Sequence, residues 1–247
     1  MIPRPVNFRT ELRPESIPEG VGGTGPYGLT GGWHTRDVSV GGCTWRLTIP
    51  AVPDALLDEP EAVVASVSDD RMPYWAFVWP AALPMAAAVL RAGWQTDLPV
   101  LELGCGTGLV GLAALARGLH VTLTDYEPRA VELARHNALQ NGYSRFVARV
   151  LDWRNPEAER YPVILGCDLL YQESAFEPLL NLLEKMLAPG GECWLGDGGR
   201  NSAVKFWCLA RERGYDMELR GEDGRVLESP ARDFQLFVLR RRTGLAD

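Results

Sequence analysis

The sequence predicts a doubly wound α/β fold built on a seven-stranded, mostly parallel sheet. First, short runs rich in Val, Leu and Ile alternate with longer amphipathic segments between residues 100 and 213, as in βαβ units. Second, one such run, 100–103, leads directly into three glycines at alternate positions. Third, the runs 217–220 and 234–240 have no helix-length segment between them. One of these two is therefore expected to run antiparallel at the sheet edge.

Composition excludes several classes of protein. The 247 residues are 46% hydrophobic and 23% charged, which is enough apolar material for a sizeable core. A net charge of −7 gives no overall basic field for a nucleic-acid backbone. The five cysteines form no C-x-x-C pair, the three histidines are scattered, and residues 1–20 lack a signal-peptide apolar run. We therefore expect a cytoplasmic protein with no disulfide framework, no metal site and no nucleic-acid partner.

The first 72 residues are predicted to form an N-terminal extension. Residues 1–35 contain seven glycines and five prolines without apolar periodicity, which indicates an irregular arm. Apolar residues alternate through 38–49 around Gly41-Gly42, which predicts a β-hairpin. A short helix is expected near 54–66. The segment 73–90 lacks charge but contains three prolines, so a buried loop and helix, not a membrane span, are expected there.

Residues 73–247 are predicted to form the main, Rossmann-like domain. Its first helix, 80–91, has proline in its first turn and Gly93 beyond its end. The expected strands are 100–103, 121–124, 146–151, 163–166, 192–195, 217–220 and 234–240. The expected helices between them are 109–117, 128–141, 176–187 and 203–213.

The strongest chemical signal is the loop of Gly104, Gly106 and Gly108 between a predicted strand and helix. Glycine lets the backbone turn sharply and lets a flat polar ligand approach the main chain. A ligand-free turn, the alternative, needs only one glycine. Asp125 lies 21 positions after Gly104, at the end of the next strand, where a carboxylate can accept ribose hydroxyls. It is also placed to cap the helix that Pro128 begins, and both roles can coexist.

The glycines alone leave the cofactor open, because Gly106 to Gly111 also fits the G-x-G-x-x-G pattern of nicotinamide dinucleotide enzymes. Other features favour S-adenosylmethionine. Glu102 lies in an apolar strand, where a carboxylate needs a cationic group or backbone donors. Asp152 beside Trp153 offers an acceptor and an aromatic plane for adenine. Pro189-Gly190-Gly191 and the terminal hairpin complete a seven-stranded pattern.

The motif E-x-G-x-G-x-G at 102–108, within residues 73–241, resembles class I, seven-β-strand S-adenosylmethionine-dependent methyltransferases. The resemblance implies that S-adenosylmethionine is the cofactor. It also implies cofactor contacts at Glu102, Gly104, Gly106, Gly108, Asp125, Asp152 and Trp153.

A finer resemblance is to the methyltransferase 16 family of protein lysine methyltransferases, whose D-x-x-Y signature matches Asp168 to Tyr171. Tyr74-Trp75-Ala76 and Trp79-Pro80 are most similar to the branch that acts on the electron-transfer flavoprotein β subunit. The family resemblance implies that Trp79 lies against the cofactor.

Sheet topology gives Asp168 a catalytic interpretation without the family. The first and fourth strands of a doubly wound sheet flank its switch point, so the glycine loop and Asp168 should face one crevice. A helix cap or turn is the alternative for Asp168, and core packing is the alternative for Tyr171. Tyr74 and Trp75 are expected to line an apolar channel for a lysine side chain, unless they only pack a helix onto the sheet.

These observations predict an S-adenosylmethionine-dependent N-methyltransferase that acts on a protein lysine, with Asp168 and Tyr171 as catalytic residues. The expected partner is a protein with an accessible lysine, with no nucleic acid and no membrane. Three alternatives stay open: a small-molecule N-methyltransferase, a nicotinamide-dependent oxidoreductase and a non-catalytic cofactor-binding protein.

Overall fold

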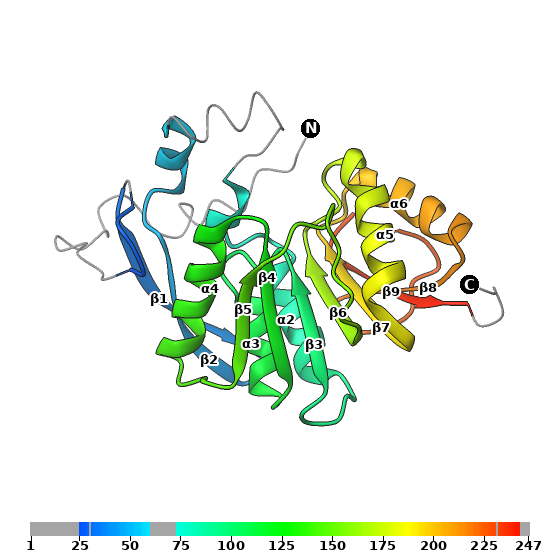
Figure 1. Ribbon diagram of the computed structural model, residues 1–247, viewed down its shortest axis with the longest axis horizontal. Helices are drawn as coiled ribbons and strands as arrows, with labels where there is room; N and C mark the ends of the chain where they lie inside the picture. Colours follow the sequence, from blue (N-terminus) through cyan, green and yellow to red (C-terminus); the bar gives the residue numbers. More distant parts are fainter. Residues whose placement is uncertain (1–24, 30, 60–72, 231, 243–247) are drawn as a thin grey trace.

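A seven-stranded sheet with the strand order β5-β4-β3-β6-β7-β9-β8 forms the centre of the protein (Figure 1). The computed structural model describes residues 25–29, 31–59, 73–230 and 232–242. The strands are β3 Pro99–Leu103, β4 His120–Asp125, β5 Phe146–Val150, β6 Tyr161–Cys167, β7 Leu187–Asp197, β8 Tyr215–Arg220 and β9 Gln235–Arg241. Strands β3 to β7 are parallel, and β9 is antiparallel to both of its neighbours. The predicted fold class is confirmed.

The antiparallel strand, β9, does not lie at the very edge of the sheet. Strand β9 lies between β7 and β8, one position inside the edge, and β8 is the edge strand. Five consecutive residues of β9 are buried, whereas β8 carries charged residues. Inserting β9 therefore buries the more apolar strand and leaves charged side chains along the open edge, which discourages pairing with other chains. Strand β7 also begins at Leu187 rather than 192, with a register shift where the Pro-Gly-Gly segment lies.

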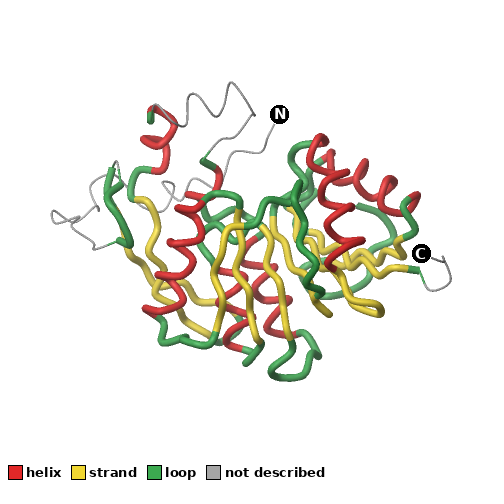
Figure 2. Tube along the Cα trace, in the orientation of Figure 1, coloured by secondary structure: helices red, strands yellow, loops and turns green. Residues whose placement is uncertain are grey.

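Helices cover both faces of the sheet (Figure 2). Helices α2 Ala82–Arg91, α3 Leu109–Ala116 and α4 Pro128–Gln140 pack into one apolar cluster. Helices α5 Phe176–Met186 and α6 Asn201–Glu212 pack into a second. The chain leaves β3 towards the first set and β6 towards the second, so a switch point lies between these adjacent strands. In such sheets the crevice at the carboxyl ends of the switch-point strands is the usual place for a ligand.

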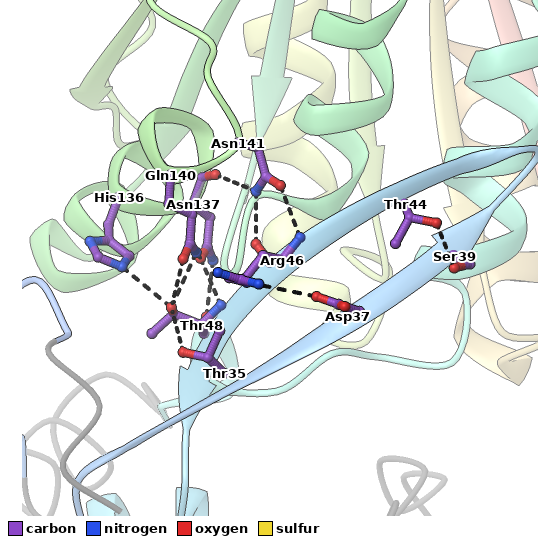
Figure 3. Close-up of polar contacts among 10 residues, drawn as sticks. All are labelled: Thr35, Asp37, Ser39, Thr44, Arg46, Thr48, His136, Asn137, Gln140 and Asn141. Carbon is purple, nitrogen blue, oxygen red and sulfur yellow. Dashed lines mark hydrogen bonds and ion pairs between the residues drawn. The ribbon is translucent and has the colours of Figure 1, made fainter.

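The N-terminal hairpin, β1 Trp33–Val40 and β2 Cys43–Pro50, packs against α4 (Figure 3). Asn137 accepts the Thr48 backbone N–H at 2.9 Å and donates to the Thr48 carbonyl at 3.0 Å. Asn141 repeats this pairing with the backbone of Arg46. Asn137 also donates to the carbonyl of Thr107 in the glycine loop at 2.8 Å. One buried amide therefore ties the hairpin, the helix and the loop together.

The segment before the main domain departs from prediction. Within the short helix expected near 54–66, the described residues form a 3-10 helix, η3 Pro53–Asp58, with proline at its first turn and its C-cap at Glu59. Residues 60–72 and most of the predicted arm, 1–24 and 30, lie outside the described residues. The charge-free segment forms a one-turn 3-10 helix, η4 Tyr74–Ala76, followed by α2. Within the described residues no helix is long and apolar enough to span a bilayer.

Candidate active site

A pocket opens at the carboxyl ends of β3, β4 and β6, beneath the segment that contains η4. It brings together most of the predicted site residues, namely Tyr74, Trp75, Trp79, Glu102, Gly104, Gly106, Asp125, Trp153, Asp168 and Tyr171. Two predicted residues, Gly108 and Asp152, are not among those that line it. Residues far apart in the sequence thus meet at the predicted crevice.

The glycine loop needs glycine for two separate reasons. Gly104, Gly106 and Gly108 all have positive φ angles, of 60°, 49° and 81°, which other residues rarely adopt. A Cβ at Gly106 would lie 3.2 Å from the Trp75 carbonyl, so the loop and the η4 segment approach closely. Gly108 instead is the N-cap of α3, and a Cβ there would meet Ala134 of α4 at 3.0 Å. Gly108 therefore serves helix packing.

Glu102 is a buried carboxylate with an unsatisfied oxygen. It is 3% exposed and lines the pocket, and its Oε2 has no hydrogen-bond partner among the described residues. Burial raises the pKa of Glu102 to about 8, the Asp125 charge adds to the rise, and a hydrogen bond from the Gly111 backbone opposes it. An acceptor in this state favours a ligand that brings a donor or a positive charge.

Asp125 braces the glycine loop from the end of β4. Its Oδ2 accepts the Gly106 N–H at 3.1 Å, and its Oδ1 accepts the Glu127 N–H at 3.0 Å. Burial raises the pKa of Asp125 to about 6, although these backbone hydrogen bonds oppose the rise. The helix-cap alternative does not apply, because Glu127 caps α4 by accepting the Arg129 N–H.

Asp168 follows β6 in a left-handed backbone conformation, with φ of 57°. Its Oδ1 pairs with the guanidinium of Arg200, and its Oδ2 accepts the Ala81 N–H at 3.2 Å. Burial raises the pKa of Asp168, whereas the charge of Arg200 opposes that rise. The cap positions of the next 3-10 helix and of α5 are Gln172 and Ala175, so Asp168 caps neither helix.

Aromatic rings form one wall of the pocket. Tyr74 lies edge-on to Trp79 and Tyr171, with ring centroids 5.6 and 5.3 Å away. Phe77 lies 5.8 Å from Trp79, whose indole N–H donates to the Tyr74 carbonyl at 2.8 Å. These contacts hold several rings beside Asp168 and give this side of the pocket an apolar surface.

Of the two residues predicted to bind adenine, Asp152 and Trp153, only Trp153 lines the pocket. Trp153 lines the pocket beside the loop, where its ring would lie 3.7 Å from a Cβ at Gly104. The Asp152 carboxylate binds Arg154, with an Nη2 to Oδ2 distance of 2.6 Å. An adenine amine would therefore share Asp152 with this arginine, and the role of Asp152 stays a prediction.

Sequence reasoning missed three features of the site. Tyr126 lines the pocket, and its position directly after Asp125 was the available signal. Arg200 pairs with Asp168, although only its place after the end of the neighbouring β7 pointed there. Cys105 and Cys167 also line the pocket, and burial raises the pKa of both thiols, so they are neutral and poor nucleophiles. No metal-binding group of three His, Cys, Asp or Glu residues occurs in the described ranges.

Comparison with known proteins identifies relatives of this chain. The profile of the family described as "Lysine methyltransferase" matches residues 75–206. Histidine protein methyltransferase 1 homolog of Dictyostelium discoideum is 36% identical over 103 residues, 39% of this chain and 33% of that protein. Protein N-lysine methyltransferase METTL21A of Xenopus tropicalis is 38% identical over 112 residues, 42% of this chain and 52% of that protein. The matched part thus spans between a third and about half of these relatives' length.

The fold also matches solved structures. A TehB-like SAM-dependent methyltransferase from Corynebacterium glutamicum ATCC 13032 has a TM-score of 0.53 and 20% sequence identity. The alignment covers 64% of this chain and 88% of that one. At this identity the similarity concerns the fold alone.

Proposed function

This chain belongs to the lysine methyltransferase family, and on that premise we propose that it transfers a methyl group from S-adenosylmethionine to a lysine amine of a protein. The observation that carries the proposal is the unpartnered, buried Glu102 oxygen in the pocket beside the glycine loop. It fits a ligand with a cationic amino-acid group and hydroxyls, because such a ligand supplies the missing donors.

The other residues of this half of the pocket also fit S-adenosylmethionine. Positive φ angles at Gly104 and Gly106 let the loop turn sharply at the end of β3, and both glycines line the pocket. Asp125 offers carboxylate oxygens at the end of the second parallel strand, and Trp153 offers an aromatic plane. When bound, S-adenosylmethionine supplies an electrophilic methyl group, and this chain's task is to orient the nucleophile.

A lysine acceptor must lose a proton to water before its free electron pair can attack. The N–C bond to the methyl group then forms as the S–C bond breaks, and the sulfur keeps the electron pair of the broken bond in the departing S-adenosylhomocysteine. With an ordinary pKa of about 10.4, keeping the free amine at pH 7 costs about 4.6 kcal/mol. Trp79, which was expected against the cofactor, also lies in the aromatic wall with Tyr74 and Tyr171, and we assign it to the border between the two ligands. Together with Trp75, which lines the same pocket, this wall excludes water and lowers the amine pKa. A carboxylate raises it, so we assign Asp168 to attracting and orienting the amine. Tyr171 lies edge-on to Tyr74 and is assigned to the same channel.

The proposal covers the whole of residues 73–247 as the methyltransferase domain, with residues 1–72 as an extension. All five cysteines are free in the structure, which fits the reducing cytoplasm. The net charge of −7 supports a protein acceptor over nucleic acid or an acidic membrane surface.

Radioactive methyl transfer tests the proposal. Purified protein is incubated with tritium-labelled S-adenosylmethionine and a desalted cell extract, and the label is followed into protein and into small molecules. Label in protein that acid hydrolysis recovers as methyl-lysine supports the proposal. Label recovered as methyl-histidine, or only in small molecules, contradicts the lysine assignment. An absence of cofactor binding together with binding of a nicotinamide dinucleotide contradicts the whole proposal.

The acceptor needs a second experiment. The Tyr-Trp-Ala and Trp-Pro elements support the electron-transfer flavoprotein β subunit as a candidate. Purified β subunit and a variant with its lysines replaced by arginine are offered with labelled cofactor. Transfer to the first alone supports this acceptor, whereas label in other extract proteins but not in the β subunit excludes it.

A further inference from the structure

Three charged side chains form a buried cluster beside the pocket: Asp168, Asp197 and Arg200. Their side chains are 2%, 0% and 6% exposed. Arg200 Nη1 contacts Asp168 Oδ1 and lies 3.2 Å from Asp197 Oδ2. Buried charges are costly unless paired, so this arginine is what allows two carboxylates to lie side by side.

Local backbone contacts hold the cluster in place. Asp197, the last residue of β7, accepts the backbone N–H groups of Gly199 and Arg200, each at 2.8 Å. The side-chain amide of Gln235 lies 3.3 Å from Asp197 Oδ1, the oxygen that accepts both of these N–H groups. Arg200 therefore leaves the turn after β7 in an orientation set by Asp197, with its guanidinium directed at Asp168.

Arg200 also contacts the aromatic wall. Its guanidinium carbon lies 5.6 Å from the ring centroid of Trp79, a cation-π distance. Trp79 in turn donates to the Tyr74 carbonyl. One arginine therefore touches both parts of the pocket that are assigned to the acceptor, the carboxylate and the rings, although Arg200 is not among the residues that line the pocket.

Resting on the proposed methyl transfer, we propose that Arg200 is a positioning residue for the acceptor amine. It keeps the Asp168 carboxylate charged and in one orientation, and it supports the Trp79 ring beside that carboxylate. The cluster contains two carboxyl groups and one guanidinium, so its formal charge is −1. That charge attracts a lysine ammonium into the pocket, where the aromatic wall favours its deprotonation.

The two neighbours of Asp168 act on it in opposite directions. The positive charge of Arg200 lowers the pKa of Asp168, and the negative charge of Asp197 raises it. The Cys167 thiol lies 4.0 Å from Asp168 Oδ2. The other titratable residues that line the same pocket are Tyr74, Glu102, Cys105, Asp125, Tyr126 and Tyr171. Arg200→Gln should therefore shift the titration of Asp168 to higher pH, and Asp197→Asn should shift it to lower pH.

Carboxyl NMR measures this titration directly. The full-length protein is labelled with aspartate carrying carbon-13 at the carboxyl, and Asp168→Asn identifies the Asp168 signal. We expect Arg200→Gln to move its midpoint upward by about one pH unit or more, a tenfold change in proton affinity. Asp197→Asn should move it downward. An unchanged midpoint in Arg200→Gln, or shifts of the same sign in both variants, overturns the proposal.

Methyl transfer to the protein fraction of the desalted extract gives the second readout. Transfer needs ionised Asp168, so the acid limb of the rate profile should move in the same directions as the NMR midpoint. Arg200→Lys keeps the charge but not the planar contact with Trp79. Compared with Arg200→Gln, it should return the Asp168 midpoint to the wild-type value and recover only part of the methyl-transfer rate. A full loss of rate with a wild-type midpoint in Arg200→Lys contradicts the charge part of the proposal.

Controls separate this inference from the proposed function. Arg213→Gln removes an arginine that pairs with Glu177 and Glu184 away from the pocket, and should change neither readout. If the wild-type protein transfers no methyl group, the proposed function fails while the NMR shifts still decide the role of Arg200. If Arg200→Gln does not fold, two variants still test the proposal. Asp197→Asn should move the Asp168 midpoint downward, and Arg200→Lys should leave it near the wild-type value.

Discussion

Two buried carboxylates at the ends of adjacent parallel strands, Glu102 on β3 and Asp168 after β6, differ in what surrounds them. Glu102 has an oxygen without a partner among the described residues, and burial raises its pKa to about 8. Asp168 has Arg200 on one oxygen and the Ala81 N–H near the other. The Glu102 carboxyl thus keeps one oxygen without a donor in the described part of the chain, whereas both oxygens of Asp168 already have one.

The difference is informative about ligands. A buried carboxylate without a countercharge takes up a proton, and it becomes ionised when a ligand brings the missing donors. A carboxylate paired with arginine keeps its charge and its direction before any ligand arrives. The Glu102 half therefore suits a ligand that brings donors, which is the place we propose for the cofactor. The Asp168 half is organised before any ligand arrives, which suits the proposed acceptor.

The largest expected effect sharpens this comparison through pH. The folded-state pKa of Glu102, about 8, lies above its ordinary value of 4.5. The ligand-free folded protein therefore holds an extra proton between these values, and its stability falls as pH rises through this window. The slope is about 1.4 kcal/mol per pH unit, or up to about 4 kcal/mol from pH 5 to 8. Glu102→Gln should remove this contribution, as measured by urea unfolding at each pH.

Asp125 serves as an internal reference for that experiment. Its pKa of about 6 adds a fall in stability of the same sign, but only at lower pH. The free energy of unfolding of Glu102→Gln should therefore be nearly flat above about pH 7. A slope of wild-type size that persists above pH 7 in Glu102→Gln would show that Glu102 is not its source, and a flat wild-type profile there would show that Glu102 is already paired.

The next effect concerns chemistry at Asp168. Asp168→Asn removes the charge but keeps the shape, and asparagine tolerates the left-handed backbone at this position. Methyl transfer in single turnover with saturating cofactor should fall roughly 100-fold or more, while cofactor affinity stays within about twofold. A wild-type rate would leave Asp168 as a contact of the α2 segment only.

A smaller effect tests the close approach of the glycine loop to η4. Gly106→Ala and Gly118→Ala both place a Cβ on a left-handed backbone, at a cost of about 1 to 2 kcal/mol in stability. Only at Gly106 would the Cβ also lie 3.2 Å from the Trp75 carbonyl. Calorimetry should therefore show weaker cofactor binding for Gly106→Ala and wild-type binding for Gly118→Ala. Equal cofactor affinity in the two variants would show that the cofactor does not depend on the loop at Gly106.

The smallest effect concerns adenine. Asp152 already binds Arg154, and its side chain is 29% exposed, so the loss of this acceptor should weaken cofactor binding by about 1 kcal/mol. The affinity of Asp152→Ala for S-adenosylmethionine checks this. Arg154→Ala is the matched control, which should leave affinity unchanged or raise it, because it frees the carboxylate. Wild-type affinity in Asp152→Ala would place the adenine amine elsewhere.

Local pattern was sufficient for most of the fold. Short continuous apolar runs, separated by longer amphipathic segments, located all seven strands of the sheet to within a few residues. A strand that is buried on both faces requires such a continuous apolar run. The 3-10 form and early end of the helix at Pro53–Asp58 and the inserted position of β9 were not predicted. Both depend on which other segment each piece packs against, and periodicity does not contain that information.

The sequence by itself determined the glycine loop, the acidic residues at the ends of β3 and β4, and the crevice that Asp168 faces, because strand direction and glycine's backbone freedom are local properties. Only the tertiary structure decided the partners of those residues. Arg200 and Asp168 are 32 positions apart, and Asn137 reaches Thr107 across 30. Such contacts form only when the chain has folded and buried charges and amides must find donors or acceptors, a requirement that no local pattern specifies.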